Sequence, residues 1–496
     1  MTLVPLDIPA GFYRNGTDLE QSGRWRDGSL VRWRDNSLRP IGGWQERKTS
    51  FCTNVVRGMH TWEANNGTAY VAGGSYNELK AMTGGGTVYD IAPTDLTAGR
   101  ENAEVETGYG YGFYGDGFYG TPIQQNANAV PEEATQWNIQ NWGEYLVAVN
   151  KDDGRLLEWQ LNPAVKAASI ANAPTGNLGL VVTEERFIFA LGSGNNPRKI
   201  SWCDRENNTV WTPAATNEAG DIELADSGQI MQGVRTRGQT LILTDTSAHT
   251  ARYLGPPYVY GFERVGTSCG AISRKAASDV DMGVFWMGQR GFFRFDGNSV
   301  QEIPCDVFDY VFGDFNPAQQ SKVWSFANGQ YGEVWWFYCS EGATEVDRYV
   351  AYDYKEGHWL IGNLSRTSGV QRGVFRYPFL AGHNADSDIY EHEVGLNVDS
   401  SSIFAESGPI SIGAGDQVAR VTELIPDEKT QGDVNVTFKT RLYPNGAETS
   451  HGPFTTANPT SVRFTGRQVR MRVDGAILSD FRVGNMRIDM KAGGRR

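Results

Sequence analysis

A two-strand pattern recurs along most of this chain of 496 residues. Each copy has a strand of alternating β-branched and aromatic residues, then a turn, then a short strand built on an aromatic residue. The pattern returns about every 42 to 54 residues from its second copy on, near the period of a β-propeller blade. The clearest second strands are LLEWQ (Leu156–Gln160), KISWC (Lys199–Cys203), ARYLG (Ala251–Gly255), FFRFD (Phe292–Asp296) and YVAYD (Tyr349–Asp353).

This repeat predicts an all-β protein with a propeller over residues 51–400. A single blade cannot bury both of its faces, and blades stacked around an axis solve that problem. Seven units can be counted, but the first and last units can share one blade, so six or seven blades fit. The composition agrees, because 59 glycines suit tight turns and 12% aromatic residues suit a large core. No long segment has helical periodicity.

The first 50 residues predict an N-terminal arm. They carry two copies of the pattern W-R-D-x-S-L, beginning at Trp25 and Trp33. Trp and Arg are frequent at the centres of protein interfaces, so the arm is expected to contact a partner. The alternative is that its tryptophans cap the base of the propeller. The interface candidates are Arg24, Trp25, Arg32, Trp33, Arg34 and Trp44.

Residues 401–496 predict a separate β-sandwich. Val434, Val436 and Phe438 alternate with polar residues, as do the later residues Val469 and Met471. Clean alternation indicates strands with one buried face and one polar face, which is typical of antiparallel sandwiches.

An insertion over residues 93–134 interrupts the repeat. Its centre, TGYGYGFYGDGFYGTP, mixes glycine with aromatic residues and has no fixed period. An insertion of this length in a compact domain is usually functional, so its aromatic residues are expected to dock on a partner or to line a passage. The alternative is a loop packed on its own domain. The candidates are Tyr109, Tyr111, Phe113, Tyr114, Phe118 and Tyr119.

The net charge of −13 is unevenly distributed. Residues 1–50 carry +2 and residues 461–496 carry +6, which leaves −21 for residues 51–460. Phosphate binding needs clustered Lys and Arg, so the acidic part will not hold nucleic acid by its backbone. Such a surface suits DNA that slides past without sticking, or it only keeps the protein soluble.

Motifs for catalysis, phosphate binding or metal binding are missing from the sequence. Asp386 and Asp388, which lie between His383 and His392, are better explained as turn residues than as metal ligands. The pair Asp279 and Asp281 is the kind of carboxylate pair that glycoside hydrolysis uses, and it is kept as a minor alternative. The sequence thus predicts no catalytic residues, no metal, no cofactor and no enzymatic activity.

Targeting signals are also missing from the sequence. No apolar run is as long as a membrane span, and the N-terminus does not look like a signal peptide. The protein is expected to be made and kept in the cytosol, or to be carried inside a particle assembled there.

Three segments together resemble a family of short-tailed bacteriophage tail proteins, described as packaged-DNA stabilisation proteins, tail hubs or tail nozzles. They are Ile8–Gln45, the Gly/aromatic loop with the following Trp137–Asn150, and Arg463–Arg496. The resemblance implies a propeller with an added platform domain, and six copies in a ring below the portal and adaptor. It implies that the ring continues and closes the DNA channel, retains packaged DNA and docks tail fibres. The protein would then be a virion component assembled in the host cytoplasm, without membrane insertion.

Two rival functions stay open beside this resemblance. The first is a propeller that binds or cleaves glycans, which needs a convergent polar site with perturbed carboxylates. The second is a monomeric recognition propeller of a host cell, which has no need of the N-terminal segment or of the Arg-rich C-terminal sandwich.

Overall fold

The computed structural model describes residues 2–105, 131–226, 228–383, 387–398, 403–412, 417–426, 432–444, 446–475 and 479–494. The six aromatic candidates of the Gly/aromatic loop lie outside these residues. Strands dominate the described chain, and its one α-helix is the short α1 (Phe308–Gly313). None of the described helices is long and apolar enough to cross a membrane. The all-β prediction is confirmed.

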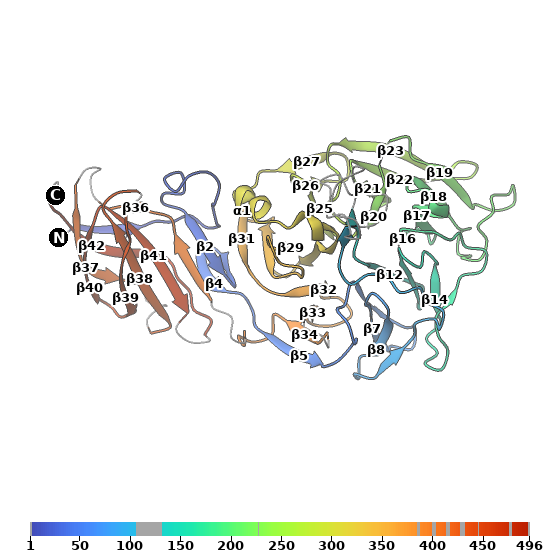
Figure 1. The fold of residues 1–496 in the computed structure, drawn as a ribbon, viewed down its shortest axis with the longest axis horizontal. Coiled ribbons are helices and arrows are strands. Elements are labelled where there is room, and N and C mark those ends of the chain that lie inside the picture. Colours follow the sequence, from blue (N-terminus) through green and yellow to red (C-terminus); the bar gives the residue numbers. More distant parts are fainter. Residues whose placement is uncertain are drawn as a thin grey trace, which may run out of the picture.

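Seven four-stranded antiparallel sheets in the described residues form the blades of a propeller (Figure 1). The innermost strand of each blade contacts the innermost strand of the next, and the contacts close into a ring. Blades 1 to 3 are β6 (Met59–Glu63), β7 (Ala69–Gly74), β8 (Leu79–Thr83), β9 (Val88–Asp90); β12 (Trp137–Trp142), β13 (Tyr145–Asn150), β14 (Leu157–Trp159), β15 (Ala168–Ser169); and β16 (Gly179–Val182), β17 (Ile188–Leu191), β18 (Lys199–Trp202), β19 (Gly220–Glu223). Blades 4 to 6 are β20 (Ile230–Thr236), β21 (Gln239–Thr244), β22 (Ser247–Gly255), β23 (Val259–Thr267); β24 (Ala277–Val280), β25 (Gly283–Gly288), β26 (Gly291–Phe295), β27 (Val300–Ile303); and β28 (Trp324–Asn328), β29 (Glu333–Tyr338), β30 (Arg348–Asp353), β31 (His358–Asn363).

The seventh blade joins the two ends of the propeller. Its inner strands are β32 (Arg366–Val370), β33 (Phe379–Gly382) and β34 (Ile389–His392), and its outer strand is β5 (Trp44–Lys48). Strand β5 pairs antiparallel with β34, so that Trp44 lies opposite His392. The ring is therefore closed by hydrogen bonds between segments about 340 residues apart in sequence. This closure fits a propeller, whose blades leave only short, protected sheet edges.

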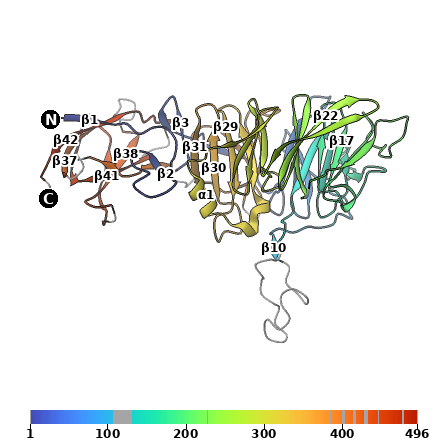
Figure 2. The ribbon, with the colours of Figure 1, turned by 90° about the horizontal axis from the view of Figure 1, so that it is seen from above.

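A two-sheet sandwich packs beside the propeller (Figures 1 and 2). Val434, Val436 and Phe438 are fully buried in it, as their alternation predicts, while Arg470 and Arg472 stay half-buried. One sheet has the order β1 (Thr2–Leu6), β42 (Met486–Ala492), β37 (Ala419–Ile425), β40 (Thr460–Gly466). The other has the order β2 (Trp25–Ser29), β35 (Phe404–Ser407), β41 (Gln468–Gly475), β38 (Val434–Arg441), β39 (Thr449–Thr455), with β36 (Ile410–Ser411) also pairing with β41.

Residues 1–50 do not form the expected arm. Strand β1 pairs with β42, and β2 pairs with β35, so both belong to the sandwich. Strands β3 (Val31–Arg34) and β4 (Ser37–Pro40) form a hairpin, and β5 completes blade 7. The physical reason is burial, because a chain this rich in Trp gains more from packing on its own two domains than from lying in water.

The junction between the two domains is a continuous hydrophobic core. Trp33 makes edge contacts with Phe12 at 4.9 Å and with His358 of blade 6 at 5.9 Å, measured between ring centroids. The Tyr349 hydroxyl of blade 6 accepts the Leu30 backbone N–H at 3.0 Å, and the Trp359 carbonyl accepts that of Phe12 at 2.8 Å. Because one core serves both domains, sandwich and propeller form one packed unit.

A buried ion triad fixes the hairpin in this junction. The Arg32 guanidinium donates to Glu333 of blade 6 at 3.1 Å and to Glu393, just after blade 7, at 2.6 Å. Arg32 also stacks on the Tyr331 ring at 3.7 Å. Burial raises the pKa of Glu333 to about 7, with Arg32 acting against the shift and Glu393 adding to it. The two carboxylates therefore depend on Arg32 for compensation.

Replacing Arg32 tests the triad. Arg32→Ala leaves two buried carboxylates without their cation, and we expect a loss of about 3–5 kcal/mol in the free energy of unfolding by urea. The matched control is Arg34→Ala in the same hairpin, since Arg34 is exposed and should change stability by less than about 0.5 kcal/mol. Equal effects of the two substitutions would contradict the assignment.

A histidine lies at the closure of the ring. Arg366 Nε donates to His392 Nε2 at 2.9 Å, and the His392 ring stacks on Trp44 of β5 with 5.3 Å between centroids. Because Nε2 accepts this hydrogen bond, the imidazole is neutral. Burial, with Arg366 adding to it, holds the pKa of His392 well below its usual range.

The closure should therefore weaken in acid. Because the pKa of His392 is depressed in the folded state, the neutral imidazole contributes its full stability above the unfolded-state pKa of about 6.5. As the pH falls below that value, the free energy of unfolding decreases by at most about 1.4 kcal/mol per pH unit. In His392→Gln, which offers an acceptor that does not titrate, the fall in unfolding free energy between about pH 7.5 and pH 5.5 should be smaller. If the unfolding free energy of both proteins changes with pH in the same way, His392 does not make the closure of the ring sensitive to acid.

Candidate functional site

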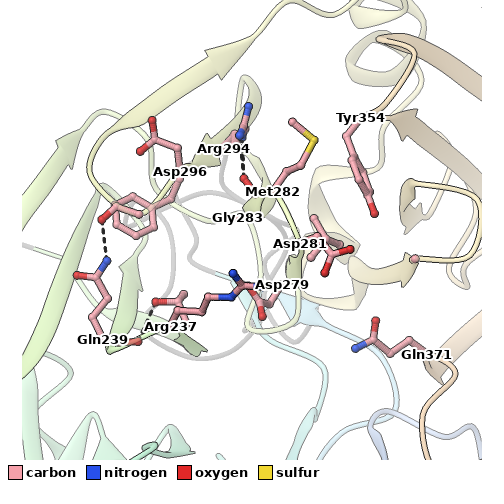
Figure 3. A pocket seen from close by; sticks show the side chains of 15 residues that line it. Arg237, Gln239, Asp279, Asp281, Met282, Gly283, Arg294, Asp296, Tyr354 and Gln371 are labelled. Atoms are coloured by element: carbon pink, nitrogen blue, oxygen red, sulfur yellow. Dashed lines mark hydrogen bonds between the residues drawn. The ribbon is translucent and has the colours of Figure 1, made fainter.

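A polar pocket lies on one face of the propeller (Figure 3). It lies over the turns that join β20 to β21 and β24 to β25, and the outer turns of blades 5 and 6 complete it. Its volume is about 510 Å³, within the range of small-molecule sites. Short polar turns form the walls of the pocket because the hairpins of the blades end at this face of the propeller.

Some of the polar groups around the pocket are engaged in holding the turns. Both Nε and Nη2 of Arg294 donate to the Met282 carbonyl, at 3.0 and 2.8 Å. Asp296 accepts the backbone N–H groups of Asn298 and Ser299, each at 2.8 Å, which is ordinary Asp chemistry in a turn. These interactions fix the turns that form the wall of the pocket.

Other polar groups are free. Within the described residues, the side chains of Arg237, Asp279, Asp281 and Gln371 have no hydrogen-bond partner, and Figure 3 shows them around the opening. Asp279 is exposed at the rim of the pocket, and the partial loss of solvent there raises its pKa; Asp281 adds to the shift, whereas Arg235 and Arg237 oppose it. The pocket thus presents acceptors and donors that the fold itself does not use.

A tyrosine hydroxyl at this pocket is buried without a partner. Tyr354, from the turn that follows β30, is 7% exposed, and its hydroxyl makes no hydrogen bond in the described chain. Figure 3 shows this hydroxyl directed toward Asp281. Burial raises the pKa of Tyr354, and the nearby Asp281 carboxylate raises it further, so the phenol stays protonated.

The pocket continues toward the propeller axis. A second cavity of about 370 Å³ shares Asp279 and Gln371 with it and reaches His60 on β6. Burial lowers the pKa of His60 to about 4, and its Nε2 lies 3.0 Å from Asn141 Oδ1. A third, small cavity beyond it is lined by Lys275, whose pKa burial lowers to about 8. A polar path therefore follows the inner strands of blades 5 to 7.

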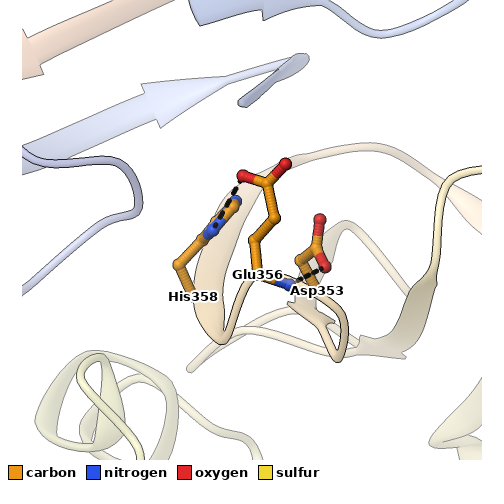
Figure 4. Close-up of side chains that lie close together, drawn as sticks. All are labelled: Asp353, Glu356 and His358. Carbon is orange, nitrogen blue, oxygen red and sulfur yellow. Dashed lines mark hydrogen bonds and ion pairs between the residues drawn. The ribbon is translucent and has the colours of Figure 1, made fainter. Parts of the chain in front are cut away.

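One cluster in the described part of the chain has the composition of a metal site: Asp353, Glu356 and His358 (Figure 4). Its groups already have structural roles. Asp353 accepts the Lys355 and Glu356 backbone N–H groups at 2.8 Å, and Glu356 accepts that of Asp35 at 3.2 Å. We therefore interpret the cluster as a turn that docks on the N-terminal hairpin.

The structure corrects the prediction for the N-terminal interface candidates. Trp25, Trp33, Trp44 and Arg32 are at most 4% exposed and contact the chain's own domains, so their side chains are not presented to a partner. Arg24 is half-buried, with its guanidinium 5.4 Å from the centre of the Tyr13 ring. Of the six, Arg34 is the exposed one.

The residues near the end of blade 7 that were weighed as metal ligands bond to other parts of the fold. Asp388 accepts the Ser50 backbone N–H at 3.0 Å, and His392 accepts from Arg366, so each has a partner within the fold. Asp386 lies outside the described residues. The pocket itself was anticipated only through Asp279 and Asp281, because Arg237, Tyr354 and Gln371 come from three other blades and share no linear pattern with them.

Comparisons with known proteins leave the family of this chain open. No protein-family model matches the chain, and no curated protein matches it. Among solved structures, the chain is similar to virginiamycin B lyase from Staphylococcus aureus, with 8% identity, a TM-score of 0.43, and coverage of 70% of this chain and 98% of that one. It is also similar to a glycoside hydrolase, with 9% identity, a TM-score of 0.27, and coverage of 89% and 100%.

These comparisons correct one prediction. The expectation that the chain is not an enzyme came from missing linear motifs, but the solved structures that it resembles include a lyase and a glycoside hydrolase. A fold of this kind collects its reactive groups from separate loops, so missing motifs do not exclude catalysis. At such low identity the likeness concerns the fold alone and assigns no reaction to this chain.

Proposed function

We propose that this chain is a structural component of a short-tailed phage tail, of the hub or nozzle type. In this proposal, copies form a ring below the portal and adaptor that continues and closes the DNA channel, retains packaged DNA and docks tail fibres. The proposal rests on the order of the three resembling segments, Ile8–Gln45, the Gly/aromatic loop with Trp137–Asn150, and Arg463–Arg496.

The structural observation that supports the proposal is the packed junction of sandwich and propeller. Phe12, Trp25 and Trp33 share one core with blade 6, and the Arg32 triad crosses the same boundary. Domains that move relative to each other usually meet at smaller and more polar interfaces. A single stiff unit suits a wall element that must hold its shape while DNA is retained behind it.

The distribution of exposed apolar side chains suits a ring as well. A ring needs a heterologous interface, in which two different patches of each copy meet. Leu254 and Tyr258, 58% and 78% exposed, lie where β22 and β23 of blade 4 join. Leu442 and Tyr443, 50% and 62% exposed, follow β38 in the sandwich. In Figure 1 these strands lie toward opposite ends of the molecule.

The assembly is directly testable. Electron microscopy and light scattering of the purified chain, and of tails that contain it, should show a six-fold ring. The double substitution Tyr258→Ser and Tyr443→Ser should shift the distribution from rings toward monomers without changing the unfolding temperature, because both side chains are exposed in the single chain. A monomer that cleaves glycans would instead favour the propeller-enzyme function.

A further inference from the structure

We propose that the pocket around Asp279, Asp281 and Tyr354 binds an oligosaccharide through its hydroxyl groups. This inference goes beyond the proposed tail role and does not depend on ring formation. It rests on three observations: a buried hydroxyl without a partner, a set of free donors and acceptors, and a cavity that extends toward the propeller axis.

The Tyr354 hydroxyl is the first observation. A buried polar group without a hydrogen bond is costly, and native proteins retain few of them. Phe285 packs on the Tyr354 ring, with 5.6 Å between centroids, and limits how far the phenol can turn away. A ligand hydroxyl beside Asp281 can supply the partner that the fold lacks, since it donates and accepts at once.

The free groups select the class of ligand. Asp279 and Asp281 accept hydrogen bonds, Arg237 donates them, and Gln371 does both, which together match the adjacent hydroxyls of a sugar ring. Two unpaired carboxylates disfavour phosphate and nucleic acid. Free charged groups disfavour an apolar ligand. Among the described residues the carboxylates of this pocket do not join a cluster of closely spaced metal-ligating groups, which disfavours a cation.

The shape of the site indicates more than one sugar ring. The adjoining cavities of about 510 and 370 Å³ share Asp279 and Gln371, so a ligand can pass from the outer turns of blades 5 and 6 to His60 on the inner strand of blade 1. Two such cavities in line suit an extended chain better than a compact metabolite.

The experiment uses the full chain on an array of neutral, acidic and amino-sugar-containing oligosaccharides, followed by calorimetric titration with the oligosaccharide that gives the strongest array signal. Asp281→Asn and Tyr354→Phe should each weaken the affinity by about tenfold, the change expected when one hydrogen bond of about 1.4 kcal/mol is lost. The matched controls are Asp221→Asn and Tyr258→Phe, which change exposed side chains outside the pocket and should leave the affinity unchanged.

Tyr354→Phe also separates binding from folding. Because the substitution removes a buried hydroxyl without a partner, the unfolding temperature should stay the same or rise while the affinity falls. A chain that binds no oligosaccharide on the array would overturn the proposal. So would binding that both pocket variants retain at full strength, since the ligand would then lie elsewhere. Neither result bears on ring formation, which is measured separately.

Discussion

The buried contact of Arg32 with Glu333 and Glu393 is the constraint on which the rest of the structure depends. It places a cation from the N-terminal hairpin between blades 6 and 7, where each carboxylate alone would be costly to bury. With the hairpin held there, the segment before it enters the sandwich as β2, and the segment after it enters blade 7 as β5. The ion triad thus lies between the strands that close the two domains.

The resulting topology makes the propeller an insertion in the sandwich. The chain begins with β1 and β2 in the sandwich, builds the blades from β5 to β34, and returns to the sandwich from β35 on. Each domain therefore has a strand whose partner is hundreds of residues away. Such pairings have a high loop-closure cost before they stabilise anything, so folding of the two domains is expected to be slow and mutually dependent.

The two functional proposals rest on different parts of this architecture. The proposed tail role draws on the packed junction and on exposed side chains at both ends, whereas the proposed saccharide site draws on turns at one face of the propeller. The two are compatible because a propeller is a rigid platform whose loops vary independently of its blades. The buried Trp and Arg residues of the N-terminal segment serve the proposed tail role only indirectly, by stabilising that junction.

Local pattern determined the strands, because alternation is a property of neighbouring residues: Val434, Val436 and Phe438 are buried as it predicts. The repeat likewise determined the propeller, but left six or seven blades possible. Only the tertiary structure decided the number, since the seventh blade exists through the pairing of β5 with β34. It also decided that Trp25, Trp33 and Arg32 face inward, and that Tyr354 and Asp281 line the same pocket. Long-range contacts decide which surface covers a tryptophan and which distant turns share a pocket. No local sequence pattern encodes these contacts.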